Sequence, residues 1–273
     1  MKKSKHGEYT RFEFYNHHEI LDYVMQNEQP EPYSKAAMSD RYCPYTWDET
    51  IENLKTGWPE GVGRMSEIAE KFKTRIAEDK AYSINHDVTG DFLDIGRYMT
   101  GEPECFGCII EEPRPTETLD ITVEVGQPSA NDSANIYNRG AAITALIDEL
   151  QKQYFVNLKL IVKTEDSGFM NPETYENEKM ELIFYIDTQN EYSRDLLAFY
   201  LSNSAFLRRI IWSIFETYFK QDHVGCYGNY GKQRYFPEGN ELFFRALRRD
   251  LEKFENEEKS MAEISYILEQ YEV

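Results

Sequence analysis

Residues 119–150 have the sequence LDITVEVGQPSANDSANIYNRGAAITALIDEL, and this stretch decides the fold class. Its first seven residues alternate apolar and polar side chains, which is the two-residue period of a β-strand. The turn at residues 126–133 ends in residues that cap helices well, and apolar side chains then recur at helical spacing to about residue 153. The stretch therefore predicts a strand, a turn and a long helix.

Two further strands are predicted after that helix, at Phe155–Val162 and Met180–Asp187. A strand, a helix and a second strand in succession form a right-handed crossover, which requires a sheet that is at least partly parallel. A short helix is expected at Leu196–Tyr200, opened by Ser193, and another after a cap at Ser204. We therefore expect an α/β fold in which helices flank a partly parallel sheet.

The segments on either side of this core have different patterns. Apolar residues recur at helical spacing at Ile20–Met25 and Met65–Ile76, and residues 29–63 between them are rich in Pro, Tyr and Gly. Pro113 and Pro115 mark a boundary, because each proline forces extended geometry on its predecessor. We expect a helical and irregular N-terminal region at residues 1–113, an α/β core at 114–235, and a C-terminal helical segment at 236–273 packed on the core, with Leu242 and Phe243 facing inward.

Composition excludes several classes of protein. The chain has 273 residues, of which 41% are hydrophobic and 14% aromatic, enough for a sizeable core. No apolar run approaches the ~20 residues of a membrane span, and no apolar segment follows the N-terminal lysines as a secretory signal requires. Four scattered cysteines are too few for a disulfide framework and are expected to be reduced thiols. An intracellular protein is predicted.

The formal net charge of −19 bears on what the protein binds. It works against general nucleic-acid binding, because phosphate contacts need clustered Lys and Arg. The acidic residues concentrate at 99–126 and 165–181, which is interpreted either as surface solvation or as a surface that mimics nucleic-acid phosphate or docks on a basic protein. The candidate partner-binding residues are Glu102, Glu104, Glu111, Glu112 and Glu117, together with Trp58.

Trp58 lies in a glycine-rich segment, residues 57–63, that is not a phosphate-binding loop. The segment lacks the Lys and the following Ser or Thr that such a loop requires. Its glycines let the backbone turn, and the indole either packs inside the protein, as large aromatic side chains usually do, or recognises a partner.

A zinc site is the most specific metal hypothesis. Cys105 and Cys108 have the spacing of a zinc knuckle, and His223 and Cys226 offer two more ligands at the same spacing. The four would form a structural Cys3His site assembled from distant segments, with Cys43 as a spare thiol. The alternative is that these cysteines are ordinary core residues.

A second functional class is an enzyme or accessory factor of DNA metabolism. Asp87, Asp91 and Asp94 have the spacing of one helix face and could hold a divalent metal, although polar residues that cap the following segment explain them equally well. The same class could instead hold nucleic acid on a basic face formed by Arg208, Arg209, Arg245, Arg248 and Arg249, for which surface ion pairs are the simpler interpretation.

Two resemblances add to these patterns. The strand, loop and helix that carry Asn138–Ala142 resemble the opening of a von Willebrand A-like domain, which implies a three-layer, Rossmann-like core. At the position of that family's Asp-x-Ser-x-Ser metal motif, the segment Val125–Ser129 keeps only Ser129, so the resemblance implies a degenerate metal site. A second set of motifs is similar to an uncharacterised family of bacteriophage proteins and implies a phage or mobile-element origin: Gly57-Trp58-x-x-Gly61, DIGRYMTGEPEC at 94–105, and Arg139-Gly140 with Ala205–Arg209.

Neither the motifs nor the resemblances identify a catalytic residue. No serine-hydrolase elbow, zinc-protease, dinucleotide-binding or kinase motif is present. The sequence therefore predicts a non-enzymatic, phage-encoded acidic protein that binds a host or phage protein in the host cytoplasm, as a counter-defence inhibitor or nucleic-acid mimic. A homo-oligomer with exposed Tyr and Phe contacts is a further expectation.

Overall fold

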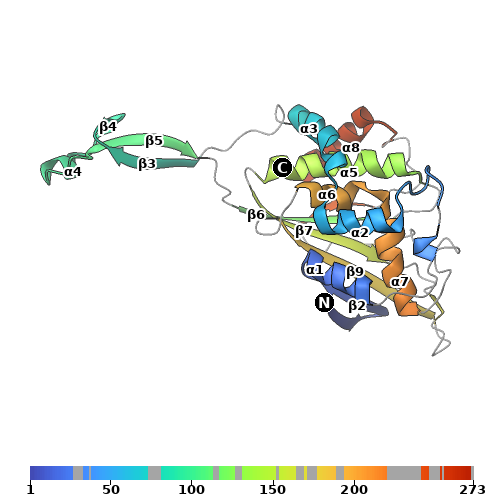
Figure 1. The fold of residues 1–273 in the computed structure, drawn as a ribbon. Helices are drawn as coiled ribbons and strands as arrows, with labels where there is room; N and C mark the ends of the chain where they lie inside the picture. The colour runs from blue at the N-terminus through green and yellow to red at the C-terminus, as the bar shows by residue number, and fades with distance from the viewer. Residues whose placement is uncertain are drawn as a thin grey trace.

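The computed structural model describes residues 1–26, 33–36, 38–72, 81–112, 117–126, 131–151, 154–163, 169–170, 177–188, 194–219, 241–245, 253 and 255–271. The fold combines a large mixed sheet, helices packed on it, and a separate three-stranded sheet (Figure 1). The large sheet consists of β1 (Lys2–His6), β2 (Tyr9–Phe14), β6 (Glu117–Glu124), β7 (Tyr154–Lys163), β8 (Phe169–Met170), β9 (Asn177–Asp187) and β10 (Leu242–Phe244). The helical segments packed with it are α1 (His17–Gln26), η1 (Tyr33–Lys35), α2 (Trp47–Thr56), α3 (Pro59–Phe72), α5 (Ser133–Leu150), α6 (Arg194–Ser202), the π-helical η2 (Phe206–Ile211), α7 (Trp212–Phe219) and α8 (Glu257–Tyr271).

The strand order confirms the predicted α/β unit. The order is β1-β2-β9-β7-β6-β10, with β8 paired to β9. β6 runs parallel to β7, and α5 connects them along the chain, as the alternation at residues 119–125 and the helical spacing after it predict. β10 is parallel to β6 and β2 to β9, whereas β9 is antiparallel to β7, so the sheet is mixed.

The hydrophobic core lies between one face of the large sheet and the helices (Figure 1). Phe14 of β2 stacks on Phe184 of β9 with ring centroids 5.1 Å apart, and Phe206 of η2 meets Phe184 edge-on. α5 is the central helix, because it contacts α3, α6 and α8 and almost every side chain from Ile136 to Leu150 is buried. Asp132 caps α5 by accepting a hydrogen bond from the backbone N–H of Asn135.

The opposite face of the sheet carries cross-strand ion pairs. Glu181 of β9 is fully buried between Arg11 of β2 and Lys163 of β7, with charged-atom distances of 2.5 and 2.7 Å. Glu241 lies just before β10, where its carboxylate is 3.0 Å from Lys159 Nζ. Buried charges need partners of this kind, since an unpaired carboxylate loses its hydration without compensation.

The Glu181 cluster predicts how stability depends on pH. Burial alone raises the pKa of Glu181, but hydrogen bonds from Lys163 and Arg11 lower it by more, so the net pKa lies below that of an unfolded glutamate. A depressed pKa contributes stability above the unfolded pKa of about 4.3, and this contribution is lost as pH falls through the folded pKa. We expect Glu181→Gln to be less stable than the wild type at pH 7 and to lose less further stability between pH 5 and 3.

Urea unfolding at a series of pH values measures this difference. The half-exposed imidazole of His6 also contacts the cluster, with Nδ1 3.4 Å from the Glu181 carboxylate, and it is the same in both proteins. Glu255→Gln is the matched control, because Glu255 forms an exposed ion pair with Lys259 and such pairs contribute little to stability. Equal pH dependence in wild type and Glu181→Gln would contradict the prediction.

Two buried arginines of η2 contact residues 33–45. Arg208 donates to the backbone carbonyl of Tyr42, and its guanidinium carbon lies 3.6 Å from the centre of the Tyr42 ring. Arg209 donates to the carbonyls of Tyr45 at 2.6 Å and Ser34 at 2.7 Å. Arg208 and Arg209 are only 1% and 3% exposed, so the suggestion that they form part of a nucleic-acid-binding face is wrong.

The N-terminal region is less helical than the sequence patterns indicate. β1 and β2 form a hairpin, and β2 pairs with β9, more than 160 residues later in the chain. The segment expected to be a loop at 29–63 contains α2, which begins at a capping box formed by Thr46 and Glu49. α3 already begins at Pro59, so Ser66 lies inside it and does not cap it. The helical expectation was wrong for the hairpin, and the loop expectation was wrong for α2.

The C-terminal segment also differs from the expected run of helices. Leu242–Phe244 is a strand, β10, and its three residues are buried beside β6. Among the described residues of this segment, α8 is confirmed as a helix, whereas residues 246–252 lie outside the described part of the chain. After α6, the next helix begins at Ser204, but the cap is Asn203, whose side-chain oxygen accepts a hydrogen bond from the Ala205 N–H at 2.9 Å. No helix among the described residues is long and apolar enough to cross a membrane.

Candidate functional site

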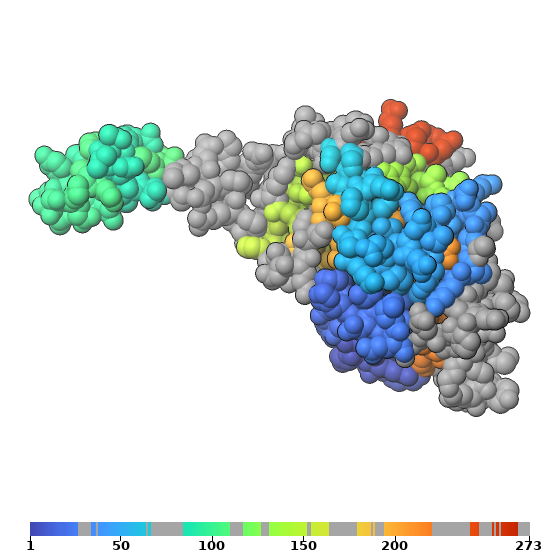
Figure 2. Space-filling view, in the orientation of Figure 1, coloured from blue at the N-terminus to red at the C-terminus, as the bar shows by residue number. Residues whose placement is uncertain are grey.

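A three-stranded sheet with one short helix stands apart from the large sheet. It comprises β3 (Ala81–Asp87), β4 (Phe92–Leu93), α4 (Ile95–Met99) and β5 (Phe106–Glu112), in the strand order β3-β5-β4. We call residues 81–112 the arm. Figure 2 shows residues 84–109 of the arm as a green projection, and none of the arm's described residues belongs to the main hydrophobic core.

The arm is held together by local pairing. All seven residues of β3 pair antiparallel with β5, and β4 pairs with the other edge of β5. The ring of Phe92 lies directly on Gly107, where a Cβ atom would be only 2.3 Å from the ring. Because Gly107 has no side chain, the Phe92 ring can pack directly on the backbone of β5 at this position.

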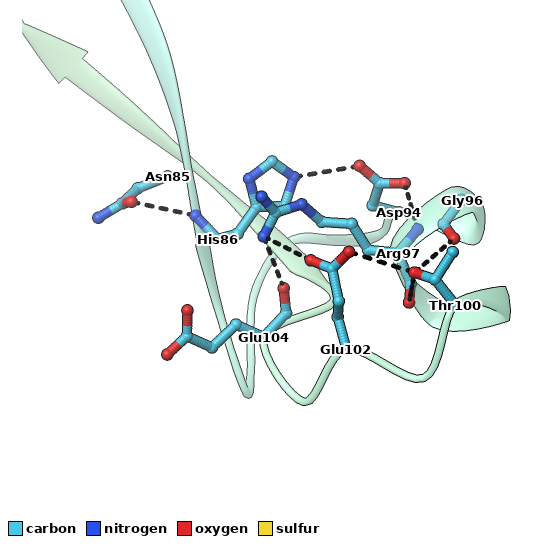
Figure 3. A network of polar contacts seen from close by, with 8 residues as sticks. All are labelled: Asn85, His86, Asp94, Gly96, Arg97, Thr100, Glu102 and Glu104. Carbon is cyan, nitrogen blue, oxygen red and sulfur yellow. Dashed lines mark hydrogen bonds and ion pairs between the residues drawn. The ribbon is translucent and has the colours of Figure 1, made fainter.

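A polar network orders the tip of the arm (Figure 3). Asp94 caps α4, because one carboxylate oxygen accepts the backbone N–H of Arg97 at 3.2 Å and the other lies 3.1 Å from His86 Nε2. The Arg97 guanidinium lies 3.4 Å from the Glu102 carboxylate and donates to the carbonyl of Glu104 at 3.3 Å. The network joins α4 to β3 and to the loop before β5.

The same contacts set the charge of the Asp94 carboxyl. The hydrogen bond from the Arg97 backbone N–H lowers the pKa of Asp94, and the contact with His86 lowers it further, outweighing the effect of burial. Asp94 is therefore a carboxylate at neutral pH. Its bonds to two segments of the arm give it a structural role.

Apolar side chains are unusually exposed on the arm. Of the thirteen exposed large apolar side chains among the described residues, eight lie there. Met99 is 80% exposed, Ile95 66% and Tyr98 63%, and their spacing places all three on one side of α4. Ile84 and Ile109 are cross-strand neighbours and are also exposed. The remaining three are Val88, Phe92 and Leu93.

The arm is also strongly acidic. It contains seven acidic residues and a single Lys or Arg residue, Arg97. The acidic residues are Asp87, Asp91, Asp94, Glu102, Glu104, Glu111 and Glu112. Exposed apolar contacts surrounded by one sign of charge are typical of a surface that meets a partner of the opposite charge.

Four of the six predicted partner-binding residues lie on the arm. Glu102 and Glu104 are exposed at its tip, and Glu111 and Glu112 are the last two residues of β5. Glu117 is exposed at the start of β6. Trp58 is different, because only 6% of it is exposed and its ring packs edge-on against Tyr45 and Tyr137. The structure therefore gives Trp58 the packing role and leaves it no surface for a partner.

The structure describes half of the predicted zinc ligands. Cys105 is buried in the arm, and its carbonyl accepts the Asp94 N–H at 2.8 Å. The Cys108 thiol donates to the carbonyl of Thr89 at 3.2 Å. Cys43, Cys105 and Cys108 are free thiols, as expected. His223 and Cys226 lie outside the described residues, so zinc binding by the four stays a prediction.

The three aspartates do not share a helix face. Asp87 ends β3 and accepts the N–H of Val88, while Asp91 accepts the N–H of Ile109 at 2.9 Å from a turn. Asp94 is the α4 cap. Within the described ranges, no group of three or more His, Cys, Asp or Glu residues is arranged to hold a metal. The helical placement of these aspartates was wrong, and their turn and capping roles account for them.

Sequence reasoning missed the apolar residues of the arm. The five residues of α4 are too few to show helical periodicity, and the acidic residues around them directed attention to charge. The available signal was the spacing of Ile95, Tyr98 and Met99 in a segment with few other apolar residues.

Comparisons with known proteins identify a family. A family model described as "Domain of unknown function (DUF7192)" matches residues 3–272. Comparison with curated proteins gave no match, and neither did comparison with solved structures.

Proposed function

The chain belongs to the family described as Domain of unknown function (DUF7192), and we propose that it is a non-catalytic factor that binds a basic protein partner through the arm. The observation that carries the proposal is the cluster of exposed apolar side chains on α4 and the neighbouring strands. Isolated exposed apolar residues are ordinary, whereas a group of them on a projecting element costs solubility unless a partner covers it.

The charge of the arm supports a basic partner. Seven acidic residues and one basic residue give the arm a negative potential that attracts a positive surface and speeds association. Tyr98 and Met99 supply the aromatic and flexible apolar contacts that are enriched in interface centres. The acidic residues around them form the polar rim.

We further propose where the protein originates and which protein it acts on. The similarity to bacteriophage proteins supports a phage-encoded factor that acts in the host cytoplasm on a host or phage protein. Its acidity supports a counter-defence inhibitor that occupies a nucleic-acid-binding surface of that partner. We also propose that the α/β core is von Willebrand A-like. In this proposal the core holds the arm in place, and its degenerate metal site binds no metal.

Site-specific cross-linking tests the proposed function. We replace Tyr98 with a photoreactive phenylalanine analogue and, as the control, Tyr266 of α8, which is exposed to a similar degree. We expect a partner from host extract to cross-link at position 98 but not at position 266, and we expect that partner to be basic. Cross-linking at neither position, or equal cross-linking at both, would argue against the arm as the partner-binding surface.

Binding of the purified partner then tests the apolar contacts. We expect Ile95→Ser/Met99→Ser to weaken binding by about tenfold or more, since truncation of central apolar contacts often costs over 1 kcal/mol each. Met25→Ser/Tyr266→Ser removes exposed apolar side chains from the body and should leave affinity unchanged. Raising the salt concentration should weaken binding through screening. An acidic partner, or full affinity in the arm variant, would refute the proposal.

A further inference from the structure

The outer strand of the arm has an open edge. β3 pairs with β5 on one side, and no other described strand pairs with it. It is seven residues long, which is enough to pair along its length with a further strand.

Hydrogen bonds on the far side of β5 show which backbone groups of β3 point outward. The carbonyl of Gly107 accepts the Asp91 N–H, and the Ile109 N–H donates to the Asp91 carboxylate, so both β5 residues direct their backbone groups away from β3. Their register partners on β3 are His86 and Ile84. In an antiparallel ladder, residues opposite such positions also point away from the partner strand.

Ile84 is the central residue of β3 whose backbone groups point away from β5. The N–H of His86 is already bonded to the side-chain oxygen of Asn85 at 3.1 Å. The backbone N–H and C=O of Ile84 face outward beside an exposed isoleucine side chain.

The two edges of the large sheet are protected, and β3 is not. β1 carries Lys2, Lys3 and Lys5, and β10 at the opposite edge is only three residues long. Lysines and short strands are the usual devices that prevent unwanted pairing at a sheet edge. β3 has neither Lys nor Pro. The edges of the large sheet are therefore protected against pairing, whereas the β3 edge of the arm is open.

The charge of the arm indicates what pairs with this edge. A second copy would bring another seven acidic residues against the first seven, which opposes association. A basic segment would be attracted, and alternate apolar residues could pack beside Ile84 and Ile109, which are exposed neighbours.

We infer that the partner docks as an extended basic segment that adds to the outer edge of β3 as a fourth strand. The inference rests on the proposed function and specifies its binding mode. Main-chain hydrogen bonds to Ile84 supply affinity, and the acidic residues of the arm select for lysine and arginine.

A defined peptide tests the edge in the full-length protein. The probe is a capped seven-residue peptide of alternating Lys and Val, and the control peptide has Glu in place of Lys. We expect the basic peptide to bind and the acidic one not to bind. Ile84→Pro should weaken binding by about tenfold, which corresponds to the loss of one edge hydrogen bond, whereas Ile84→Ala should stay within about threefold.

Proline at position 84 is suited to this test. The Ile84 N–H points away from β5, so its removal takes no hydrogen bond from the β3–β5 ladder, and prolines are tolerated on sheet edges for this reason. If Ile84→Pro nevertheless disturbs the arm, a probe that is N-methylated along one edge tests the same pairing in the wild-type complex, because it removes the hydrogen bonds that the peptide would donate to the outward carbonyls of β3, including that of Ile84. Amide exchange gives an independent measurement, in which the peptide should slow exchange at Ile84 and leave the inward-facing amide of Asn85 unchanged.

The outcomes separate the binding mode from the proposed function. Full affinity in Ile84→Pro and with the N-methylated peptide, or unchanged exchange at Ile84, would overturn edge pairing. Cross-linking at position 98 would still stand in that case, because the apolar side of α4 would then hold the partner. Failure of the basic peptide to bind, or concentration-dependent dimerisation lost in Ile84→Pro, would overturn the basic segment as occupant.

Discussion

Gly140→Ala is expected to lower the free energy of unfolding by about 3 kcal/mol or more, near or beyond the upper end of ordinary overpacking effects. A Cβ atom at this position would lie 2.0 Å from the carbonyl oxygen of Leu201 and 2.5 Å from the Cα of Ser202. Both obstacles are backbone atoms of α6, so rotation of a side chain cannot relieve the overlap. α5 and α6 would have to separate, and close-packed interiors resist such a shift.

Chemical denaturation of the purified variant measures this effect. Gly63→Ala is the matched control, because Gly63 lies inside α3 and, apart from its chain neighbours and the backbone of its own helix, no described atom lies within 4 Å of the added methyl group. There the substitution should stabilise the protein by about 0.5–1 kcal/mol, since alanine has the higher helix propensity. A Gly140→Ala protein as stable as the wild type would show that α5 and α6 are not packed as closely as described.

Arg139→Met is expected to cost about 3–5 kcal/mol, the usual loss when one member of a buried ionic cluster is removed. The Arg139 side chain is 2% exposed and donates to the carbonyls of Glu124 at 3.2 Å, Phe244 at 3.1 Å and Arg245 at 2.6 Å. Glu124 and Phe244 are the last residues of β6 and β10, and Arg245 follows β10, so one guanidinium joins α5 to the ends of two parallel strands. Methionine fills the volume but leaves the carbonyls without this donor.

The charge of Arg139 is retained in the folded protein. Burial lowers the pKa of Arg139 to about 10, and the nearby Glu124 carboxylate limits the shift. The side chain therefore stays protonated at pH 7, and its removal takes away a positive charge that interacts with the Glu124 carboxylate. Arg139→Lys keeps the charge but loses the planar fork of donors, so we expect it to recover only part of the stability.

Arg194→Met is the control for Arg139→Met. Arg194 pairs with Asp148 of the same helix α5, but its side chain is 42% exposed. An exposed ion pair contributes about 0–1 kcal/mol, so urea unfolding should separate the two variants clearly. Equal losses in the two variants would contradict the role assigned to the carbonyl contacts of Arg139.

The central α/β unit was predictable because its signals are local. The alternation at residues 119–125 and the helical spacing after Ser133 fix β6 and α5, and both elements are found within two or three residues of the predicted ends. β7 and β9 were predicted for the same reason. Burial on one face produces a periodic pattern that requires no knowledge of the rest of the chain.

The elements that were missed depend on distant partners. β2 is a strand because β9 supplies its hydrogen bonds, and β10 because β6 does, and these pairings join residues more than 100 positions apart. Leu242–Phe244 is too short to show a period, so its apolar residues fit a helix equally well. Arg208 and Arg209 suggested a basic surface, because sequence alone does not show that backbone carbonyls surround them.

The candidate site divides in the same way. The sequence by itself determined the acidity around residues 102–112 and the α/β class of the core, because both follow from local composition and spacing. Only the tertiary structure decided that β3, β4, α4 and β5 form an arm outside the core, with Ile95, Tyr98 and Met99 exposed. An apolar residue is exposed or buried according to what packs on it, and that depends on contacts made far away in the chain.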